Sequence, residues 1–299
     1  MILMHVLITG ASGFLGRQLI TFLDKKHDVY VLTHRHGLSV RNLQQLNGDI
    51  LQPDEFGKKL MDIDAVIHLA AINKARTDLE CKRLFETNVV GTFNMLEIAR
   101  KMAVRKFIFA SSAAVYGHKK VQPVKETFPP NPKSLYGLSK LISERTCMYY
   151  GSTHGFSAVC LRISNIYGPD QPSGFIVTDL FDKSNLFNMI EVENSSSTRD
   201  FVYVGDAARA LAKCLDVNVS GVINVGSGKE TSALEIAIQL GKFSGKKVVS
   251  KEGANRDVER NVLDIGRARA LLCWEPEMPL EKGLRITWEH LVARAGTRG

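Results

Sequence analysis

The sequence predicts an α/β fold, a doubly wound parallel sheet with a smaller, interleaved C-terminal part. Short apolar runs rich in Val and Ile recur through the first half of the chain, and the segments between them have helical spacing. That alternation is typical of βαβ units, in which successive strands are parallel. A group of glycines directly after the first run indicates a strand that turns sharply into a helix.

Five strands are expected in order along the first part of the chain. The runs are HVLITG, DVYVLT, DAVIHLAA, RKFIFASS and SAVCLRIS. Between two of them, residues 83–102 carry apolar side chains at helical intervals, which predicts an amphipathic helix. Past Ile163 the pattern loosens into stretches rich in Pro, Gly and Ser, followed by shorter elements. We therefore expect two domains, residues 1–163 and residues 164–299, with some exchange of segments between them.

Composition bounds the class of protein. The chain has 299 residues, of which 44% are hydrophobic and 23% charged, as expected for one large domain or for one domain with a smaller partner. No apolar stretch reaches the roughly 18 residues that a membrane helix needs, and the first residues lack the basic flank and cleavage site of a signal peptide. We expect a cytoplasmic protein without a membrane partner.

The distribution of charges and cysteines disfavours a nucleic-acid-binding, disulfide-rich or metal-binding protein. The formal net charge is +8, but Lys and Arg are spread along the chain rather than gathered in a stripe, so a nucleic-acid partner is not expected. An anionic small-molecule ligand would account for the charge. The cysteines are scattered and form no C-x-x-C pair, which indicates neither a disulfide framework nor a metal site. They are Cys81, Cys147, Cys160, Cys214 and Cys273.

Gly10, Gly13 and Gly16 lie between the first predicted strand and the first predicted helix. Such a turn presents backbone N–H groups and the positive end of the helix dipole to a ligand, which suits the pyrophosphate of a dinucleotide. The spacing, G-x-x-G-x-x-G, is also compatible with a tight turn that binds nothing. In this context we interpret the motif as a cofactor site, which makes residues 1–163 a Rossmann-type NAD(P)-binding domain.

The end of the second predicted strand bears on which dinucleotide is bound. An acidic residue there would bond the adenosine ribose and repel a 2′-phosphate, whereas an arginine would accept that phosphate. The sequence has Thr33, His34 and Arg35 at this place, which favours NADP over NAD unless Arg35 only solvates a loop. Asp49, in the motif NGDI after the third strand, is placed either to meet the adenine edge or to cap the next helix.

Ser112, Tyr136 and Lys140 are the candidate catalytic residues. Tyr136 and Lys140 are four residues apart in the motif YGLSK, so on a helix they share a face. A nearby ammonium would lower the pKa of the phenol from about 10, which would let Tyr136 exchange a proton near neutral pH. Ser112 would hold the same substrate oxygen, and Lys140 would also hold the nicotinamide ribose. The alternative is a surface tyrosine beside a solvated lysine.

These motifs occur in the order TGASGFLG, GDI, HLAA, NVVGT, SSAAVYG, YGLSK, RISNIYGP and RDFVYVGDAARA. In that order the chain resembles the extended short-chain dehydrogenase/reductase family, in its nucleotide-sugar epimerase, dehydratase and reductase branch, over nearly its whole length. The resemblance implies a nucleotide-diphosphate sugar as substrate and a homodimer that pairs through two helices of each subunit. It also implies that Ser112, Tyr136 and Lys140 are catalytic.

The resemblance assigns binding residues as well. Asn165, Arg199 and Arg256, together with Ser112, would contact the substrate, Arg199 through a phosphate, and Tyr167 would lie beside the nicotinamide. The cofactor would be lined by Gly10, Ser12, Gly13, Phe14, Leu15, Gly16, Thr33, Arg35, Asp49, Ile50, Leu69, Ala70, Ala71, Asn88, Tyr136 and Lys140.

Three departures from the family pattern matter. Ala113 and Ala114 stand where the dehydratases carry an Asp-Glu pair, so dehydration is disfavoured. The segment between YGP and RDF is shorter than usual, which alters the nucleotide pocket. Ala254 stands where an arginine is common, which leaves Arg256 or Arg260 as the second phosphate contact.

Three functions remain. Our leading expectation is an NADPH-dependent reductase of a nucleotide-bound 4-keto-hexose, because Thr33 and Arg35 favour NADP. The alternative is a nucleotide-sugar 4-epimerase with tightly bound NAD, which the motif SSAAVYG resembles. The third is a dinucleotide-binding regulatory protein without chemistry, and the intact pair of Tyr136 and Lys140 argues against it.

Overall fold

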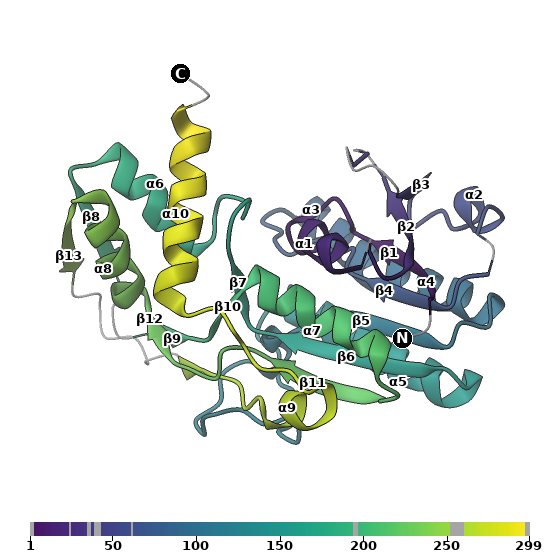
Figure 1. The fold of residues 1–299 in the computed structure, drawn as a ribbon. Coiled ribbons are helices and arrows are strands. Elements are labelled where there is room, and N and C mark those ends of the chain that lie inside the picture. The colour runs from purple at the N-terminus through teal and green to yellow at the C-terminus, as the bar shows by residue number, and fades with distance from the viewer. Residues whose placement is uncertain are drawn as a thin grey trace.

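A parallel sheet of seven strands organises the chain (Figure 1). The computed structural model describes residues 3–23, 25–34, 37–38, 43–60, 62–193, 197–251 and 260–296. The strand order is β11-β6-β5-β4-β1-β2-β3, and every neighbouring pair is parallel. This confirms the predicted doubly wound α/β class. The strands are β1 (His5–Thr9), β2 (Asp28–Thr33), β3 (Gln44–Asn47), β4 (Ala65–His68), β5 (Lys106–Ser112), β6 (Ser157–Ile163) and β11 (Gly221–Val225).

Helices cover both faces of this sheet. Side chains of α1, α7 and α9 pack on one face, and side chains of α4 and α5 pack on the other. A π-helical turn at Glu86–Val90 joins α3 to α4, and a 3-10 turn at Ala113–Tyr116 follows β5. The helices are α1 (Phe14–Leu23), α2 (Asp54–Gly57), α3 (Asp78–Phe85), α4 (Gly91–Lys101), α5 (Leu135–His154), α7 (Val204–Asp216) and α9 (Gly266–Leu272).

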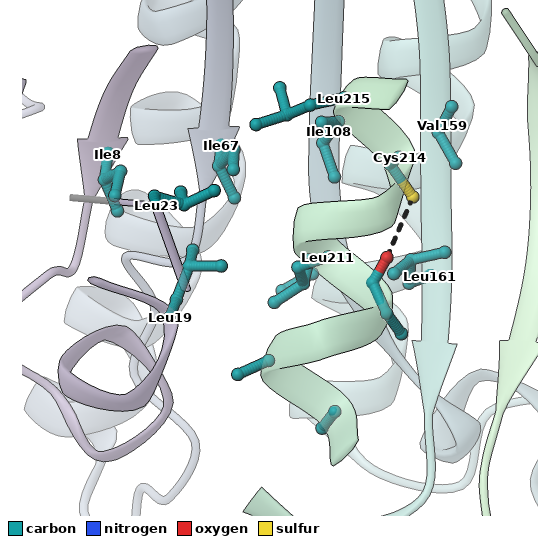
Figure 2. Close-up of a cluster of buried hydrophobic side chains, with 14 of the residues drawn as sticks. Ile8, Leu19, Leu23, Ile67, Ile108, Val159, Leu161, Leu211, Cys214 and Leu215 are labelled. Atoms are coloured by element: carbon teal, nitrogen blue, oxygen red, sulfur yellow. Dashed lines mark hydrogen bonds between the residues drawn. The ribbon is translucent and has the colours of Figure 1, made fainter. Parts of the chain in front are cut away.

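Alternate residues of each strand point into opposite layers, which is why the strands form continuous apolar runs in the sequence. In β1, Val6 and Ile8 pack with α1 and α7, while Leu7 packs with α4 and α5. Figure 2 shows the first layer, where Leu23 of α1 and Leu211 of α7 belong to one apolar cluster with the strands. Fully burying one such side chain stabilises the fold by about 1.5–3 kcal/mol.

A smaller part continues from the carboxyl end of β6. Its core is built around the parallel pair of β8 and β13, with α6, α8 and α10 packed against it (Figure 1). The remaining strands form a two-stranded pair of β7 with β10 and a three-stranded sheet of β12, β9 and β14. These elements are β7 (Asn165–Tyr167), α6 (Ile176–Leu186), β8 (Met189–Glu193), β9 (Thr198–Arg199), β10 (Phe201–Tyr203), β12 (Thr231–Ser232), α8 (Ala233–Ser244), β13 (Lys247–Lys251), β14 (Arg260–Asn261) and α10 (Leu280–Gly296).

The two parts exchange segments. After α6 and β8 the chain returns through β10 to α7 and β11, which belong to the large sheet, and then leaves again for α8 and β13. Residue 163 is therefore the end of β6 and the first of several crossings. A division of the chain at that residue stays a proposal.

Asp200 joins the crossing segments. Its side chain is fully buried, and its carboxylate accepts hydrogen bonds from the backbone N–H groups of Ser227 (2.6 Å), Gly228 (3.1 Å) and Leu263 (3.2 Å). The hydroxyl of Ser164 donates to the same carboxylate at 3.2 Å. Burial raises the pKa of this carboxyl, and these donors offset part of the rise. The contacts hold β9 in place beside the end of β6.

Within the described ranges, none of the helices combines the length and the apolarity needed to cross a lipid bilayer. In that same part of the chain, no cluster of His, Cys, Asp and Glu side chains has the geometry for a metal ion. The five cysteines form no disulfide.

His68 is a buried histidine at the end of β4 that couples stability to pH. Its ring nitrogens lie 2.6 Å from the hydroxyl of Thr9 and 3.0 Å from the hydroxyl of Thr92. Burial, and then the charge of Lys140, lowers its pKa from 6.5 to about 3. Between those two values the unfolded chain binds a proton that the folded protein excludes. Stability therefore falls as the pH falls through this window.

We expect His68→Gln to remove this component of the pH dependence. Below its unfolded pKa the histidine lowers the unfolding free energy by up to about 1.4 kcal/mol per pH unit, and glutamine cannot bind the proton. Urea unfolding between about pH 7 and pH 5 measures the slopes. The exposed His154→Gln variant is the control. Equal slopes for His68→Gln and the wild type would contradict the prediction.

Candidate active site

Gly10, Gly13 and Gly16 form the turn between β1 and α1. Gly10 has a left-handed backbone with φ of 71°, and a Cβ there would lie 2.6 Å from the backbone nitrogen of Ala70. A Cβ on Gly16 would lie 2.4 Å from the carbonyl oxygen of Gly10. At the exposed Gly13, the nearest described atom to an added Cβ is that same oxygen, at 3.1 Å. Two of the glycines are thus required by packing, whereas Gly13 leaves room for a phosphate at the helix N-terminus.

A cavity of about 480 Å³ opens beside this turn, at the carboxyl ends of β1, β2 and β4. The order of the strands reverses there, because β1 lies between β2 and β4, and ligands of open α/β sheets bind at such switch points. Five of the predicted cofactor residues line the cavity. They are Gly10, Ser12, Asp49, Ile50 and Ala70. These residues fit a dinucleotide whose pyrophosphate lies on the glycine turn.

Other predicted cofactor residues lie next to this cavity but do not line it. Phe14 and Leu15 begin α1 and are half-buried, and Leu69 and Ala71 belong to the loop that follows β4. They flank the two backbone segments that form the cavity wall. Their contact with a cofactor stays a prediction.

Asn88 has a different place from the one expected. It is only 1% exposed, and its side-chain nitrogen donates to the carbonyl of Ile72 and to the hydroxyl of Ser139, both at 2.9 Å. Its side-chain oxygen accepts from the backbone N–H of Ile72 at 2.8 Å. The amide is engaged in these bonds, so Asn88 holds the loop after β4 against α5. In this structure it supports the site from behind instead of lining the cavity.

The carboxyl ends of β2 and β3 present a histidine and an acid to the cavity. Thr33 is buried, and its hydroxyl donates to a carbonyl of β3 at 3.3 Å. His34 lies in the cavity wall with Nε2 3.3 Å from a carboxylate oxygen of Asp49. The other oxygen of Asp49 accepts from the backbone N–H of Leu51 at 2.9 Å, so Asp49 caps a turn. Arg35, on which the preference for NADP rests, lies outside the described residues.

Ser112, Tyr136 and Lys140, the Ser-Tyr-Lys trio, come together at the carboxyl end of β5. Ser112 ends the strand, and its hydroxyl accepts from a backbone N–H of the following turn at 3.1 Å. Tyr136 lies in the first turn of α5, is half-buried, and lies beside the Ser112 side chain. Lys140 is 3% exposed, and its Nζ donates to the carbonyl of Ala110 at 2.8 Å. The structure therefore brings the predicted trio together.

Burial controls the ionisation of Tyr136 in this structure. It raises the pKa of the phenol above its ordinary value, and the Ser112 side chain offsets part of the rise. Burial also lowers the pKa of Lys140 to about 8. We expected Lys140 to depress the pKa of Tyr136, and that expectation is not met. The physical reason is that the ammonium bonds the Ala110 carbonyl and lies 5.9 Å from the centre of the Tyr136 ring.

A buried ion pair behind the trio was missed from the sequence. Glu144 of α5 and Arg162 of β6 have side chains only 2% and 4% exposed. Arg162 donates through Nε to a Glu144 oxygen at 3.0 Å and through Nη2 to the other oxygen. Ser111, next to Ser112, also donates to Glu144, at 2.9 Å. The signals were a glutamate one helical turn after Lys140 and an arginine that interrupts an apolar strand.

Arg199 lies on the opposite side of the site, on β9. It lines a second cavity, of about 180 Å³, together with Ala114, Ser134 and Arg260. Ala114 follows the end of β5 and Ser134 caps α5, so this cavity adjoins the trio. Asp200 and Asp206, which follow Arg199 in the sequence, make contacts of their own. Asp200 accepts from backbone amides, and Asp206 pairs with Arg209 at 2.9 Å.

The other residues predicted to lie near the substrate or the nicotinamide differ in where the structure places them. Asn165 is exposed, and its side-chain nitrogen donates to the carbonyl of Asp200 at 3.1 Å. Tyr167 is 1% exposed and packs in the core of the smaller part, so it does not face the nicotinamide as the resemblance implied. The reason is that the strand β7 turns alternate residues inward. Arg256 lies outside the described residues, and so does Ala254.

The glycine turn predicts opposite results for two similar substitutions. Gly16→Ala places a methyl group against the Gly10 carbonyl, so it should lower the melting temperature, with about 1–3 kcal/mol lost to overpacking. Gly13→Ala should keep nearly the wild-type melting temperature but weaken dinucleotide binding, because its methyl group occupies the phosphate space. Thermal melting and calorimetric titration with NAD measure the two effects. Wild-type stability of Gly16→Ala, or wild-type affinity of Gly13→Ala, would count against this account.

Comparison with known proteins agrees with this geometry. Residues 6–226 match the model of the NAD dependent epimerase/dehydratase family. A Methanocaldococcus jannaschii protein, provisionally assigned as a UDP-glucose 4-epimerase, is 35% identical over 95% of this chain and 97% of its own. The UDP-glucose 4-epimerase of Thermotoga maritima, solved with UDP-glucose, is 30% identical and superposes with a TM-score of 0.88 over 98% of this chain and 100% of that one.

Other similar proteins differ in reaction and cofactor. UDP-glucuronic acid decarboxylase 1 of Xenopus tropicalis is 29% identical over 95% of this chain and 71% of its own. UDP-glucuronic acid 4-epimerase of Bacillus cereus, solved with UDP-glucuronic acid and NAD, is 30% identical, with a TM-score of 0.87 over 97% of this chain and 100% of that one. RMD of Pseudomonas aeruginosa, solved with NADPH, is 27% identical, with a TM-score of 0.84 over 97% and 99%.

The family match covers the glycine turn, the trio and the return of the chain to β11. The names of the epimerases and of the decarboxylase describe enzymes that act on UDP-sugars. This chain belongs to the NAD dependent epimerase/dehydratase family, of the extended short-chain dehydrogenase/reductase type.

Proposed function

We propose that this protein is an NAD-dependent nucleotide-sugar 4-epimerase. The observation that carries the proposal is the composition of the site around the end of β5. Ser112, Tyr136 and Lys140 can move a proton at a sugar hydroxyl, while Ala113 and Ala114 supply no carboxylate beside them. Epimerisation by oxidation and re-reduction at one carbon needs the Ser-Tyr-Lys trio and no additional carboxylate. The similarity to the epimerases of Thermotoga maritima and Bacillus cereus supports this reaction over the reductase that the sequence favoured.

Each member of the trio has a separate part in this reaction. NAD, when bound, supplies the acceptor for a hydride from the sugar carbon and the source of its return. Tyr136, as phenolate, would take the proton of the 4-hydroxyl and return it after the keto sugar has rotated to present its other face. Ser112 holds the same oxygen by a hydrogen bond. Lys140, whose ammonium donates to the Ala110 carbonyl, would hold the cofactor ribose.

NAD, and not the NADP expected from the sequence, is the proposed cofactor, because the similar 4-epimerase of Bacillus cereus was solved with NAD. The Thr33 hydroxyl is turned into the sheet, and the carboxylate of Asp49 is paired with His34 in the cavity wall. An NADPH-dependent reductase is therefore an outcome of the test below and not the leading proposal.

The proposal includes a homodimer. Val90, Phe93 and Tyr149 are exposed by 43%, 45% and 63%, and they lie on or beside α4 and α5. Exposed apolar side chains on adjacent helices suit a protein interface. A second copy of the chain that packs two helices against these two would cover them.

Turnover tests the function. Purified protein should interconvert UDP-glucose and UDP-galactose, or the corresponding hexuronates, without added reductant, and mass spectrometry should find NAD retained. Tyr136→Phe should lower turnover by about 10²–10⁴-fold and leave NAD bound, because only the proton carrier is lost. The matched control is Tyr30→Phe, a half-buried tyrosine of β2 outside the trio. Consumption of NADPH with a 4-keto sugar and no epimerisation would identify a reductase instead, and release of CO₂ from UDP-glucuronate a decarboxylase.

Arg199 provides a test of the nucleotide part of the substrate. A guanidinium binds a diphosphate through paired, charge-assisted hydrogen bonds worth roughly 1.5–3 kcal/mol each. Arg199→Ala should therefore raise KM for the nucleotide sugar by about ten- to a hundredfold and affect NAD binding less. Arg100→Ala, which removes an exposed guanidinium paired with Glu97, is the control. Unfolding of Arg199→Ala, or an unchanged KM, would show that Arg199 serves the fold and not the phosphate.

A further inference from the structure

Three polar side chains on one face of α5 lie against consecutive residues of β5. Tyr136, Lys140 and Glu144 follow one another at intervals of four, so they lie in line along the helix. Lys140 donates to the carbonyl of Ala110 and Glu144 accepts from the hydroxyl of Ser111, while Tyr136 lies beside Ser112. The orientation of α5 against the sheet is therefore set by polar contacts as well as by packing. Glu144 is the member of this row that the proposed reaction does not use.

Arg162 connects this row of side chains to the 3-10 turn that follows Ser112. It donates two hydrogen bonds to Glu144, and its guanidinium lies 4.5 Å from the centre of the Tyr116 ring. Tyr116 ends the 3-10 turn that begins directly after Ser112, and its hydroxyl donates to Asn224 of β11 at 2.7 Å. Arg162 thus contacts both the helix that carries the tyrosine of the trio and the turn that follows the serine.

Stability alone does not account for this ion pair. Two charges in a core lose their hydration, and an apolar pair of similar size often stabilises a fold as well or better. Arg162 also has a buried nitrogen, Nη1, without a hydrogen-bond partner among the described residues, and an unpaired buried donor lowers stability. Two parallel N–H···O bonds do supply geometry, because they fix both the distance and the rotation of α5 relative to β6.

We infer that the Glu144–Arg162 ion pair is a positioning device that keeps the Tyr136 phenol aligned with the Ser112 hydroxyl. Glu144 holds the helix that carries Tyr136, and Arg162 supports the turn after Ser112 through Tyr116. The inference rests on the proposed function, in which both hydroxyl groups contact one substrate oxygen. Glu144 and Arg162 act through the trio and are positioning residues.

Loss of this alignment has a specific consequence for Tyr136. Burial raises its pKa, and the Ser112 side chain holds the rise back. Without that contact the phenolate forms only at higher pH, so the rising limb of the pH profile of kcat moves upward. The charged group recorded beside the Tyr136 ring, Lys140 at 5.9 Å, stays in place. A pair that served only stability would lower the melting temperature and leave this limb where it is.

The test is the double variant Glu144→Met/Arg162→Met, which replaces both charges by apolar side chains of similar length. We expect a melting temperature near that of the wild type, because no unpaired charge is left in the core. We expect kcat to fall about 10- to 100-fold with KM changed less than about twofold, and the rising limb to move to higher pH. NMR titration of ¹³C-labelled tyrosine, with Tyr136 identified by its loss in Tyr136→Phe, measures the same shift without turnover.

Arg209→Met is the matched control. It removes a mostly buried guanidinium, 16% exposed, from its pair with Asp206 on α7, away from the trio. It should lower the melting temperature and leave the pH limb and the Tyr136 titration unchanged. If the double variant behaves like Arg209→Met, keeps the wild-type kcat and titration, or does not fold, the pair serves stability and the inference is overturned.

The two proposals fail in distinguishable ways. If the wild type epimerises none of the nucleotide sugars, the proposed function is wrong. The Tyr136 titration of the double variant then still decides the present inference. A raised pKa supports positioning of Tyr136 by the pair, and an unchanged pKa refutes it.

Discussion

The common direction of the seven strands is the constraint on which the site depends. Because the strands are parallel, the glycine turn after β1, the loop after β4 and Ser112 at the end of β5 all reach the same edge of the sheet. Short connections at that edge place backbone N–H groups and a few side chains around one crevice. The smaller part continues from β6 at the same edge, which puts Arg199 opposite the trio. A sheet with one antiparallel strand in its middle would send one of these groups to the far end.

Buried polar groups then hold the edge in one arrangement. His68 lies between two threonine hydroxyls, Asn88 joins the loop after β4 to α5, and Glu144 pairs with Arg162. Asp200 accepts hydrogen bonds from the backbone N–H groups of three residues in two segments. In a medium of low dielectric such groups are expensive unless they are paired, so each one allows few alternative packings. The apolar layers stabilise the fold, and these polar contacts fix how the loops and helices at the site are placed relative to the strands.

Much of the site was predictable because its signals are local. The three glycines follow a strand and open a helix, and Tyr136 and Lys140 are one helical turn apart, so spacing alone places each set on one turn or one face. Asn88 was assigned to the cofactor from a family pattern, and the structure engages its amide with Ile72 and Ser139 instead. No pattern in the sequence states which partner a buried amide chooses, because the partners come from segments that meet only after folding.

The sequence by itself determined the fold class, five strands of the first half and the residues of the trio, because strand alternation, helical spacing and turn chemistry act between near neighbours. Tertiary structure alone decided that Glu144 meets Arg162, that Thr33 turns into the sheet, and that burial raises the pKa of Tyr136. Each of these depends on how much water the surrounding segments remove and on which distant groups they bring within a few ångströms. Desolvation is a sum over the whole packed neighbourhood, and no short stretch of sequence contains that sum.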